Sequence, residues 1–394
     1  MKEWKTYTLA EISNGKGEYG IGAPAIPYDE NKYTYLRITD INDDGTLNKN
    51  SLMSVDAEDA NRYLLAKNDI VFARTGNSTG RSYFYDGSDG ELVYAGFLIR
   101  FRLNESIVNP RILKYYTHSK PYFDWVKSFD TGGTRGNINA KTYGDMPIHL
   151  PPISVQNRIV EILGAIDDKI EYNRRINDNL EQQAQALFDE WFVNDSTQPA
   201  EYNRASLTDI ANYLNGLAMQ RFRPQSDEKA IPVLKIKELG QGMCDSSSDI
   251  CSQSIDSKYI VNDGDIIFSW SGTLLVDIWC GGICGLNQHL FKVTSDKYPK
   301  WFVYYWTKYH LAKFIRIAKD KTVTMGHIKR GDLETSEVLI PNAEILSKMD
   351  NIIAPIFDAI ISRRVENKTL ATLRDTLLPK LMSGELSVED VSVD

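Results

Sequence analysis

Two long stretches of the chain carry the apolar spacing of coiled-coil helices. Seam positions recur alternately four and three residues apart through 159–191, and again through 349–381. This spacing places a narrow apolar stripe along one side of a helix, although its middle is polar and three of the positions are asparagine. The predicted seam comprises Ile166, Ile170, Asn177, Leu180 and Leu187 in the first stretch, and Ile356, Ile360, Asn367, Leu370 and Leu377 in the second.

The two stretches are copies of each other. Residues 138–192 align with 328–382 without a gap, at an offset of 190 residues. Aligned identities include Pro151 with Pro341 and Asp168 with Asp358. Weaker likenesses extend upstream, such as 68–72 with 264–268. A repeat of this length predicts two similar units related by an internal pseudo-dyad.

Ahead of each helical stretch, the pattern mixes short strands with helices. Apolar runs at 69–73, 98–103, 265–270 and 289–293 are typical of strands, and segments near 110–127 and 299–318 are typical of helices. We therefore predict an α+β fold with mixed β-sheets and helices in each half. The expected regions are 1–150, 151–195, 196–341 and 342–394, alternately globular and helical.

Prolines and glycines mark the ends of these regions. Pro151 and Pro341 close the globular parts, and Ser154 and Asn342 are predicted N-caps of the helices that follow. Gly164 and Pro355 align to within one residue. An interior proline costs a helix about 3 kcal/mol, so we expect a kink or break there, leaving helices at 165–192 and 355–382.

The linker between the halves favours an antiparallel helix pair. A helix over 165–192 spans roughly 42 Å, and the linker at 193–204 reaches at most roughly 40–43 Å. In a parallel pair, the linker would have to be fully extended. We expect a dumbbell in which Asn177 faces Asn367 near the dyad. The alternative is that both asparagines are solvated.

Composition excludes some classes of protein. No apolar run approaches the roughly 20 residues that a membrane helix needs, and the start of the chain has no apolar stretch typical of a signal peptide. We therefore expect a cytoplasmic protein. The four cysteines form no Cys-x-x-Cys pair, which favours reduced thiols over a zinc site. The net charge of −8 taken alone argues against nucleic acid, but an acidic body can carry basic loops.

No catalytic motif is present. Residues 15–20 match G-x-G-x-x-G, but prolines follow where a helix is required, so we interpret them as a turn-rich loop. There is no Walker A sequence and no His-x-x-x-His pair. Residues 150–153 (Leu-Pro-Pro-Ile) lack the polar residue and the aromatic of an amino-methyltransferase signature. We predict no active site and no metal site in this chain.

Glycine-containing polar loops recur in both halves and are candidates for binding DNA. Arginine, asparagine, serine and threonine contact phosphates and base edges, and glycine allows close approach of the backbone. An ordinary polar loop is the alternative in each case. The candidates are Arg74, Thr75, Asn77, Ser78, Thr79, Arg81, Arg135, Asn137 and Lys141 in the first half, and Ser269, Trp270, Ser271, Thr273, Lys321, Thr324, His327, Lys329 and Arg330 in the second.

The helical segments resemble a known family. Residues 150–159 (LPPISVQNRI), 167–177 (DDKIEYNRRIN), 185–192 (QALFDEWF) and 377–386 (LLPKLMSGEL) are similar to the conserved regions of type I restriction–modification specificity subunits. The resemblance covers essentially the whole chain, as two target-recognition domains and two conserved helical regions.

The resemblance implies a host-defence function in DNA methylation and restriction. Each target-recognition domain would read one half of an asymmetric split site in double-stranded DNA. The antiparallel coiled coil would set the spacer and dock two methyltransferase subunits. Restriction subunits would join them. S-adenosylmethionine, ATP and Mg would be bound by those partners, and this chain would be non-catalytic. A rod of roughly 42 Å corresponds to about 12 base pairs.

Two other interpretations remain open. One is a pseudo-symmetric scaffold that bridges two proteins without touching DNA. The other is a specificity chain that serves a restriction enzyme of a different class.

Overall fold

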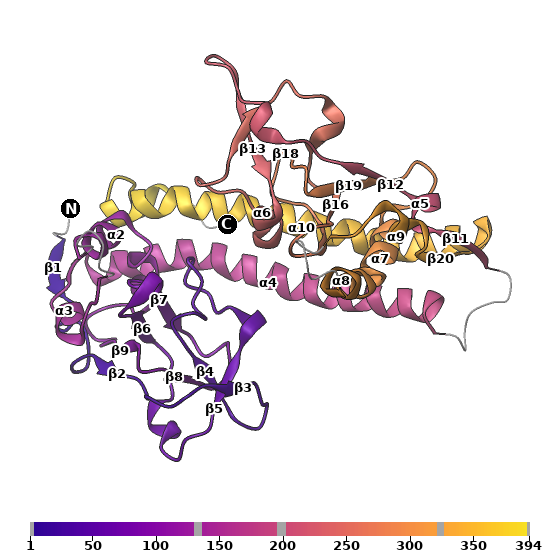
Figure 1. The fold of residues 1–394 in the computed structure, drawn as a ribbon. Coiled ribbons are helices and arrows are strands. Elements are labelled where there is room, and N and C mark those ends of the chain that lie inside the picture. Colours follow the sequence, from indigo (N-terminus) through magenta and orange to yellow (C-terminus); the bar gives the residue numbers. More distant parts are fainter. Residues whose placement is uncertain (1–3, 130–135, 195–201, 321–326, 392–394) are drawn as a thin grey trace. The chain divides into compact units, whose positions relative to one another are not determined.

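The computed structural model describes residues 4–129, 136–194, 202–320 and 327–391. The chain divides into two units (Figure 1). The first contains 1–167 and 372–394, and the second contains 168–371. Two long helices, α4 (Ile153–Phe192) and α10 (Ala343–Ser383), each contribute to both units. In the part of the chain that is described, no helix is long and apolar enough to cross a membrane.

The first unit contains two four-stranded sheets and a two-stranded one. The sheet orders are β2-β9-β6-β7, β3-β5-β4-β8 and β1-β10. Its strands are β1 (Lys5–Thr8), β2 (Glu18–Tyr19), β3 (Ile26–Pro27), β4 (Tyr33–Leu36), β5 (Met53–Val55), β6 (Asp69–Ala73), β7 (Ser82–Tyr85), β8 (Leu92–Tyr94), β9 (Leu98–Arg102) and β10 (Pro147–Leu150). Its short helices are α1 (Arg111–Tyr116), α2 (Lys120–Lys127) and α3 (Ala140–Gly144).

The second unit repeats this topology almost strand for strand. The orders are β12-β19-β16-β17, β14-β13-β18-β15 and β11-β20. Its strands are β11 (Asn203–Ser206), β12 (Asn212–Asn215), β13 (Ala230–Leu234), β14 (Ile250–Ser252), β15 (Ile260–Val261), β16 (Ile266–Ser269), β17 (Leu275–Ile278), β18 (Cys284–Leu286), β19 (Leu290–Thr294) and β20 (Glu337–Ile340). Its short helices are α5 (Leu207–Ile210), α6 (Ile236–Gln241), α7 (Lys300–Tyr309), α8 (Leu311–Asp320) and α9 (Arg330–Glu334).

Sheet pairing in the two units follows the same rules. The central strands β6 and β16 are antiparallel to both neighbours. The pairs β4–β8 and β13–β18 are parallel. The units differ at both edges of this sheet, because the first unit adds β3 beside β5 and the second adds β15 beside β18, at the opposite edge. The predicted α+β fold with two pseudo-symmetric halves is confirmed.

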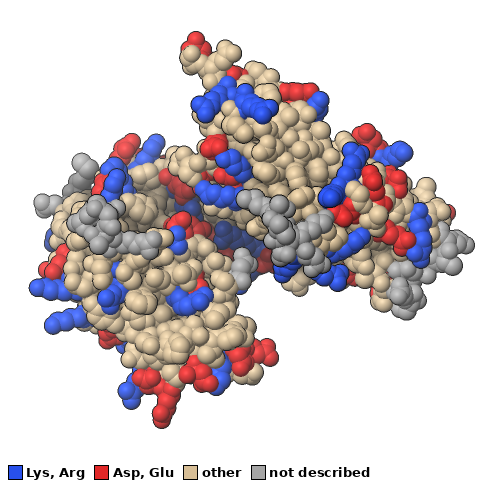
Figure 2. Space-filling model, viewed as in Figure 1, with Lys and Arg blue, Asp and Glu red and all other residues tan. Residues whose placement is uncertain are grey.

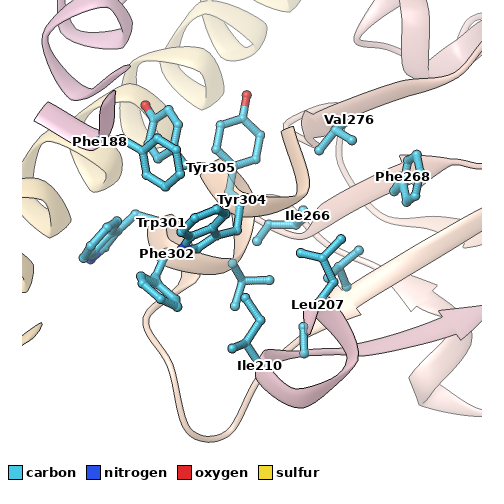
Figure 3. Close-up of a cluster of buried hydrophobic side chains, with 14 of the residues drawn as sticks. Phe188, Leu207, Ile210, Ile266, Phe268, Val276, Trp301, Phe302, Tyr304 and Tyr305 are labelled. Carbon is cyan, nitrogen blue, oxygen red and sulfur yellow. The ribbon is translucent and has the colours of Figure 1, made fainter. Parts of the chain in front are cut away.

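The core of the second unit shows how a helix is fixed to a sheet. Phe188 of α4 stacks on Tyr305 of α7 with ring centroids 5.6 Å apart, and Figure 3 shows both rings above Trp301 and Phe302. All four side chains are buried. Burying a large apolar side chain contributes about 1.5–3 kcal/mol, so this cluster holds the end of α4 firmly in the unit.

Within the second unit, α4 and α10 run antiparallel. The amide of Asn177 donates to the Ile360 carbonyl at 3.3 Å, and the amide of Asn367 donates to the Ile170 carbonyl at 3.2 Å. These two bonds are pseudo-dyad equivalents, because both pairs of residues are related by the repeat offset. The antiparallel pair is confirmed. The expectation that Asn177 faces Asn367 is wrong, since Asn367 accepts from Asn173 instead, at 2.9 Å.

The predicted helix breaks at Gly164 and Pro355 are also wrong, whereas a kink there stays a prediction. Helix α4 continues through Gly164, and α10 continues through Pro355. Ile353 and Phe357 are buried on either side of Pro355, and their burial offsets the cost of the missing backbone donor. Asn342 caps α10 as predicted, accepting from the Ile345 N–H at 2.9 Å. Ser154 lies inside α4 and is not its cap.

The predicted seam residues are covered to different extents. Ile170, Asn177 and Ile360 are buried. The remaining members are half-buried: Ile166, Leu180, Leu187, Ile356, Asn367, Leu370 and Leu377.

A charged cluster ties both helices to the body of each unit. In the first unit, Asp167 of α4 accepts from Lys114 of α1 at 2.7 Å and from Arg374 of α10 at 3.2 Å. Burial alone would raise the pKa of Asp167, but the two cations outweigh it and hold that pKa below its usual value.

The second unit performs the same task with the charges reversed. Arg364 of α10 donates to Glu181 of α4 at 2.7 Å and to Asp277 of β17 at 2.8 Å. Burial alone would lower the pKa of Arg364, but the two carboxylates raise it.

Candidate nucleic-acid interface

The central strand of the first unit ends at a residue whose backbone is fixed on both sides. The N–H of Arg74 donates to the Phe97 carbonyl at 3.0 Å, and the Ile138 N–H donates to the Arg74 carbonyl at 2.9 Å. Arg74 directly follows β6, so these bonds extend the sheet by one residue. The direction in which its side chain leaves the sheet is therefore set by the backbone.

The second unit contains the same arrangement. The Trp270 N–H donates to the His289 carbonyl at 3.4 Å, and the Ile328 N–H donates to the Trp270 carbonyl at 3.1 Å. Trp270 directly follows β16. We call these places the first and second corners. The first corner comprises Tyr19, Arg74, Phe97 and Asn137, and the second comprises the equivalent Asn215, Trp270, His289 and His327.

In the first corner, an arginine lies over an aromatic ring. The guanidinium carbon of Arg74 is 5.0 Å from the centroid of Tyr19, within the range of a cation–π contact. The Tyr19 hydroxyl accepts from the Ala140 N–H of α3 at 3.1 Å, which fixes the ring. Phe97 is 58% exposed beside them. This corner therefore presents a planar cation and an exposed ring.

In the second corner, an aromatic side chain takes the place of the cation. The Trp270 indole N–H donates to Asn215 Oδ1 at 2.9 Å, and the indole stacks on Phe291 at 5.7 Å. His289 Nδ1 lies 3.0 Å from Ser271 Oγ. Because an indole N–H can only donate, the oxygen of Asn215 faces Trp270 and its NH₂ group is left for other partners.

Two buried tyrosines fix the backbone of the first corner and its loop by hydrogen bonds. The Tyr143 hydroxyl donates to the Ala73 carbonyl at 2.9 Å, and the Tyr122 hydroxyl donates to the Gly80 carbonyl at 2.5 Å. Burial raises the pKa of both phenols, so they remain neutral donors. Thr79 also joins the two candidate loops, since its hydroxyl donates to the Gly136 carbonyl at 3.0 Å. The loops at 74–81 and 136–141 therefore form one surface.

The predicted DNA-binding residues occupy different environments. Exposed side chains are those of Asn77, Asn137, Lys141, Thr273, Lys329 and Arg330. Half-buried are Arg74, Thr75, Thr79, Arg81, Trp270 and His327. Buried are Ser78, Ser269 and Ser271. Arg135, Lys321 and Thr324 lie outside the described residues.

Several of these side chains have structural contacts of their own. Arg81 pairs with Asp43 at 2.6 Å and donates to the Ile41 carbonyl at 3.0 Å. Ser269 is fully buried and donates to the Thr273 carbonyl at 2.8 Å. Both therefore hold loops in place. Arg330 lines a hollow of about 660 Å³ that also reaches Asn215 and Phe291, next to the second corner.

The charges on the face shown in Figure 2 are mixed rather than segregated. Figure 2 shows lysine and arginine beside aspartate and glutamate over the visible face, with wide uncharged areas between them. Among the described residues, no group of three or more His, Cys, Asp or Glu could hold a metal ion. The four cysteines are unpaired. The two corners are made of hydrogen-bond donors and aromatic rings.

Sequence reasoning missed Tyr19, Phe97, Asn215 and His289 as corner residues. One signal was available, because Gly20 and Gly216 follow the first members of the two corners. A Cβ at either glycine would lie 2.2 Å from a backbone carbonyl oxygen, that of Tyr94 for Gly20 and that of Asn287 for Gly216. The offset between the units is 196 residues at these glycines and 192 at Leu98 and Leu290. A gapped alignment would have revealed the equivalence.

The comparisons with known proteins agree with this duplicated architecture. The family described as type I restriction modification DNA specificity domain matches residues 1–182 and again 199–374. The MjaIX specificity subunit of a type I restriction enzyme from Methanocaldococcus jannaschii is 27% identical, over 71% of this chain and 69% of that protein. The HindI specificity subunit from Haemophilus influenzae is 22% identical, over 98% and 100%.

A solved structure shares the fold. The crystal structure of a type I restriction-modification system S subunit from M. genitalium superimposes with a TM-score of 0.56 and 15% identity, over 96% of each chain.

Proposed function

Because this chain belongs to the type I restriction modification DNA specificity family and carries that domain twice, we propose that each of its units reads one half of a split DNA site through its corner. As a specificity subunit it is not the catalytic component. The observation that carries the proposal is the pair of corners. Their backbone frames are the same, and the side chains placed on them differ in chemistry.

Different side chains on equal frames suit an asymmetric target. Sequence is read by hydrogen bonds and apolar contacts at base edges, whereas phosphate contacts only position the protein. A guanidinium over a ring and an indole bonded to an amide select different edges. Two such surfaces in one chain favour two dissimilar half-sites. The candidate loop residues around each corner supply further contacts to bases and phosphates.

The helices provide the remaining parts of the proposal. Helices α4 and α10 set the number of unread base pairs between the half-sites and dock methyltransferase subunits, with restriction subunits completing the complex. Those partners carry S-adenosylmethionine, ATP and Mg, and all act in the cytoplasm. The proposed boundaries are 1–150 and 196–341 for the target-recognition domains, and 151–195 and 342–394 for the helical regions. Partner subunits that contact DNA also reconcile the net charge of −8 with DNA binding.

The test is to map methylation produced by the complex. The chain is co-expressed with its neighbouring methyltransferase in a host without adenine methylation, and N6-methyladenine is located by long-read sequencing. One split motif with two dissimilar halves is expected. A stable complex that methylates no motif would favour a scaffold that bridges two proteins.

A matched pair of variants connects each corner to its half-site. Arg74→Ala should relax the sequence requirement in one half of the motif, and Trp270→Ala should relax it in the other. If both variants alter the same half, or neither alters any, the assignment of one corner to each half-site is wrong.

A further inference from the structure

The first corner contains one cation whose environment is unusual. Among the described residues, no carboxylate pairs with Arg74, whereas Arg81 in the same loop pairs with Asp43. The Nε of Arg74 is buried without a hydrogen-bond partner. An arginine with a desolvated stem and no counterion is costly in the free protein, which indicates that its partner arrives with a ligand.

The ring beneath it restricts what Arg74 can bind. Tyr19 lies against the guanidinium at 5.0 Å, and its hydroxyl is held by the Ala140 N–H. A guanidinium held against a ring has a fixed plane and presents its outer nitrogens as a fork. Such a fork matches two adjacent acceptors in that plane. In the major groove, O6 and N7 of guanine form this pair, whereas adenine presents a donor beside N7.

We propose that Arg74 is the guanine-reading residue of the first unit, with Tyr19 as its positioning residue. This inference rests on the proposed function and names the base that one corner selects. The second corner has Trp270 at the equivalent place, so it does not read guanine in this way. One half of the motif therefore contains a guanine that depends on Arg74.

The test replaces one acceptor at a time. Once the motif is mapped, each guanine in it is changed singly to 7-deazaguanine, which lacks N7. Methylation rates of the intact complex are then measured for wild type, Arg74→Gln, Arg74→Lys, Tyr19→Leu and Tyr19→Phe. Arg62→Gln is the control for charge, since Arg62 is an exposed arginine of the same unit that the corner does not include.

Wild type should lose about 10- to 100-fold in rate at one guanine, as expected for a bidentate arginine contact. Arg74→Gln should already be slow and lose sensitivity to the analogue at that guanine alone. Arg74→Lys and Tyr19→Leu should both weaken the sensitivity to 7-deazaguanine at that guanine. A lysine lacks the planar fork, and a leucine leaves the fork of Arg74 unsupported. Tyr19→Phe keeps the ring, so it should retain the sensitivity, and Arg62→Gln should not change it.

Three results would overturn the assignment. The first is a motif with no guanine in either half. The second is an Arg74→Gln complex that keeps every sensitivity of the wild type. The third is an Arg74→Gln complex that loses affinity equally on all DNA sequences and releases about one ion fewer on binding. That result would identify a phosphate contact. A complex that methylates no motif at all contradicts the proposed function instead, and is distinguished by the mapping experiment.

Discussion

The two units show which parts of a recognition domain are held constant and which vary. Behind the first corner, Arg100 lies 3.7 Å from Asp69 and donates to the Leu64 carbonyl at 3.0 Å. At the equivalent place in the second unit, Lys292 lies 2.7 Å from Asp265 and donates to the Ile260 carbonyl at 2.9 Å. The geometry of backbone and charge is preserved while the corner side chains differ. The residues that hold the frame are therefore separate from the corner residues that we propose to read DNA.

The comparison also shows that equal tasks need not leave equal sequences. Asp167 and Arg364 both join the two long helices to the body of a unit, one as an anion between two cations and the other as a cation between two anions. The repeat offset does not align them. Only the structure shows that they perform the same role.

The largest difference between the units is expected at the buried cations. Arg100 and Asp69 are each about 3% exposed, whereas the side chains of Lys292 and Asp265 are 13% and 17% exposed. Removing one partner of a buried pair leaves an uncompensated charge. Arg100→Met should therefore cost about 3–5 kcal/mol, and Lys292→Met about 1–2 kcal/mol. Urea denaturation of the full chain measures both, and hydrogen exchange locates each loss.

The pH dependence of the stability of Arg100→Met tests whether the unpaired Asp69 carboxylate causes the loss. Burial raises the pKa of Asp69, and Arg100 opposes that rise. Without Arg100 the folded-state pKa rises further. A raised carboxyl pKa costs no stability below the ordinary unfolded-state pKa, and the cost is complete once the pH exceeds the folded-state pKa. The deficit relative to wild type should shrink between pH 7 and pH 4. A deficit that is constant over this range would mean that lost packing, not the unpaired carboxylate, is the cause.

Next in size is a pair of substitutions expected to have equal effects. A Cβ at Gly20 or Gly216 would meet carbonyl oxygens at 2.2 and 2.4 Å, so backbone must move in both units. Gly20→Ala and Gly216→Ala should each cost about 3 kcal/mol, measured by the same denaturation. Gly22→Ala and Gly240→Ala are the controls, since nothing lies within 4 Å of a Cβ at either position. Clearly unequal losses would show that the two frames are not equivalent.

Sequence patterns predicted the features that depend on local periodicity. The 4-3 spacing indicated both long helices, and short apolar runs indicated β6, β9, β16 and β19. The contacts of the two helices with α7 were harder to predict, because they lie beside the seam and not on it. Phe188 and Phe357 are buried one residue beyond the predicted seam positions Leu187 and Ile356. The break at Pro355 was wrong because packing outweighed a local penalty.

The corners depend on residues that are distant in the chain. Tyr19 meets Arg74 only because β2 and β6 both pair with β9, and no local pattern reports such pairing. Of the eight corner positions, the sequence indicated four. Arg74 and Trp270 follow the central strands, and Asn137 and His327 precede the aligned isoleucines. The members contributed by β2, β12 and the turns before β9 and β19 required the sheet.

A smaller effect is expected for the helix cluster of the first unit. Asp167→Asn keeps the size of the side chain but replaces the carboxylate by a neutral amide. This change should cost about 1–2 kcal/mol at pH 7. Lys114 and Arg374 hold the folded-state pKa of Asp167 low despite burial. The stabilisation is therefore present above the ordinary value of about 3.9 and is lost as the pH falls through the lower folded-state value. Glu161→Gln on the same helix is the control, because its pair with Arg158 is exposed.

The smallest effect concerns the second corner and tests whether it is preformed. Trp270→Phe retains a ring against Phe291 but removes the donor to Asn215. The single hydrogen bond should contribute about 1 kcal/mol. A double-mutant cycle of Trp270→Phe and Asn215→Ala isolates that coupling from the packing of each side chain. A coupling near 1 kcal/mol means that the asparagine amide is aimed before DNA arrives. Zero coupling means that Asn215 is free to turn, and the second corner would then acquire its specificity only on binding, unlike the arginine and tyrosine of the first.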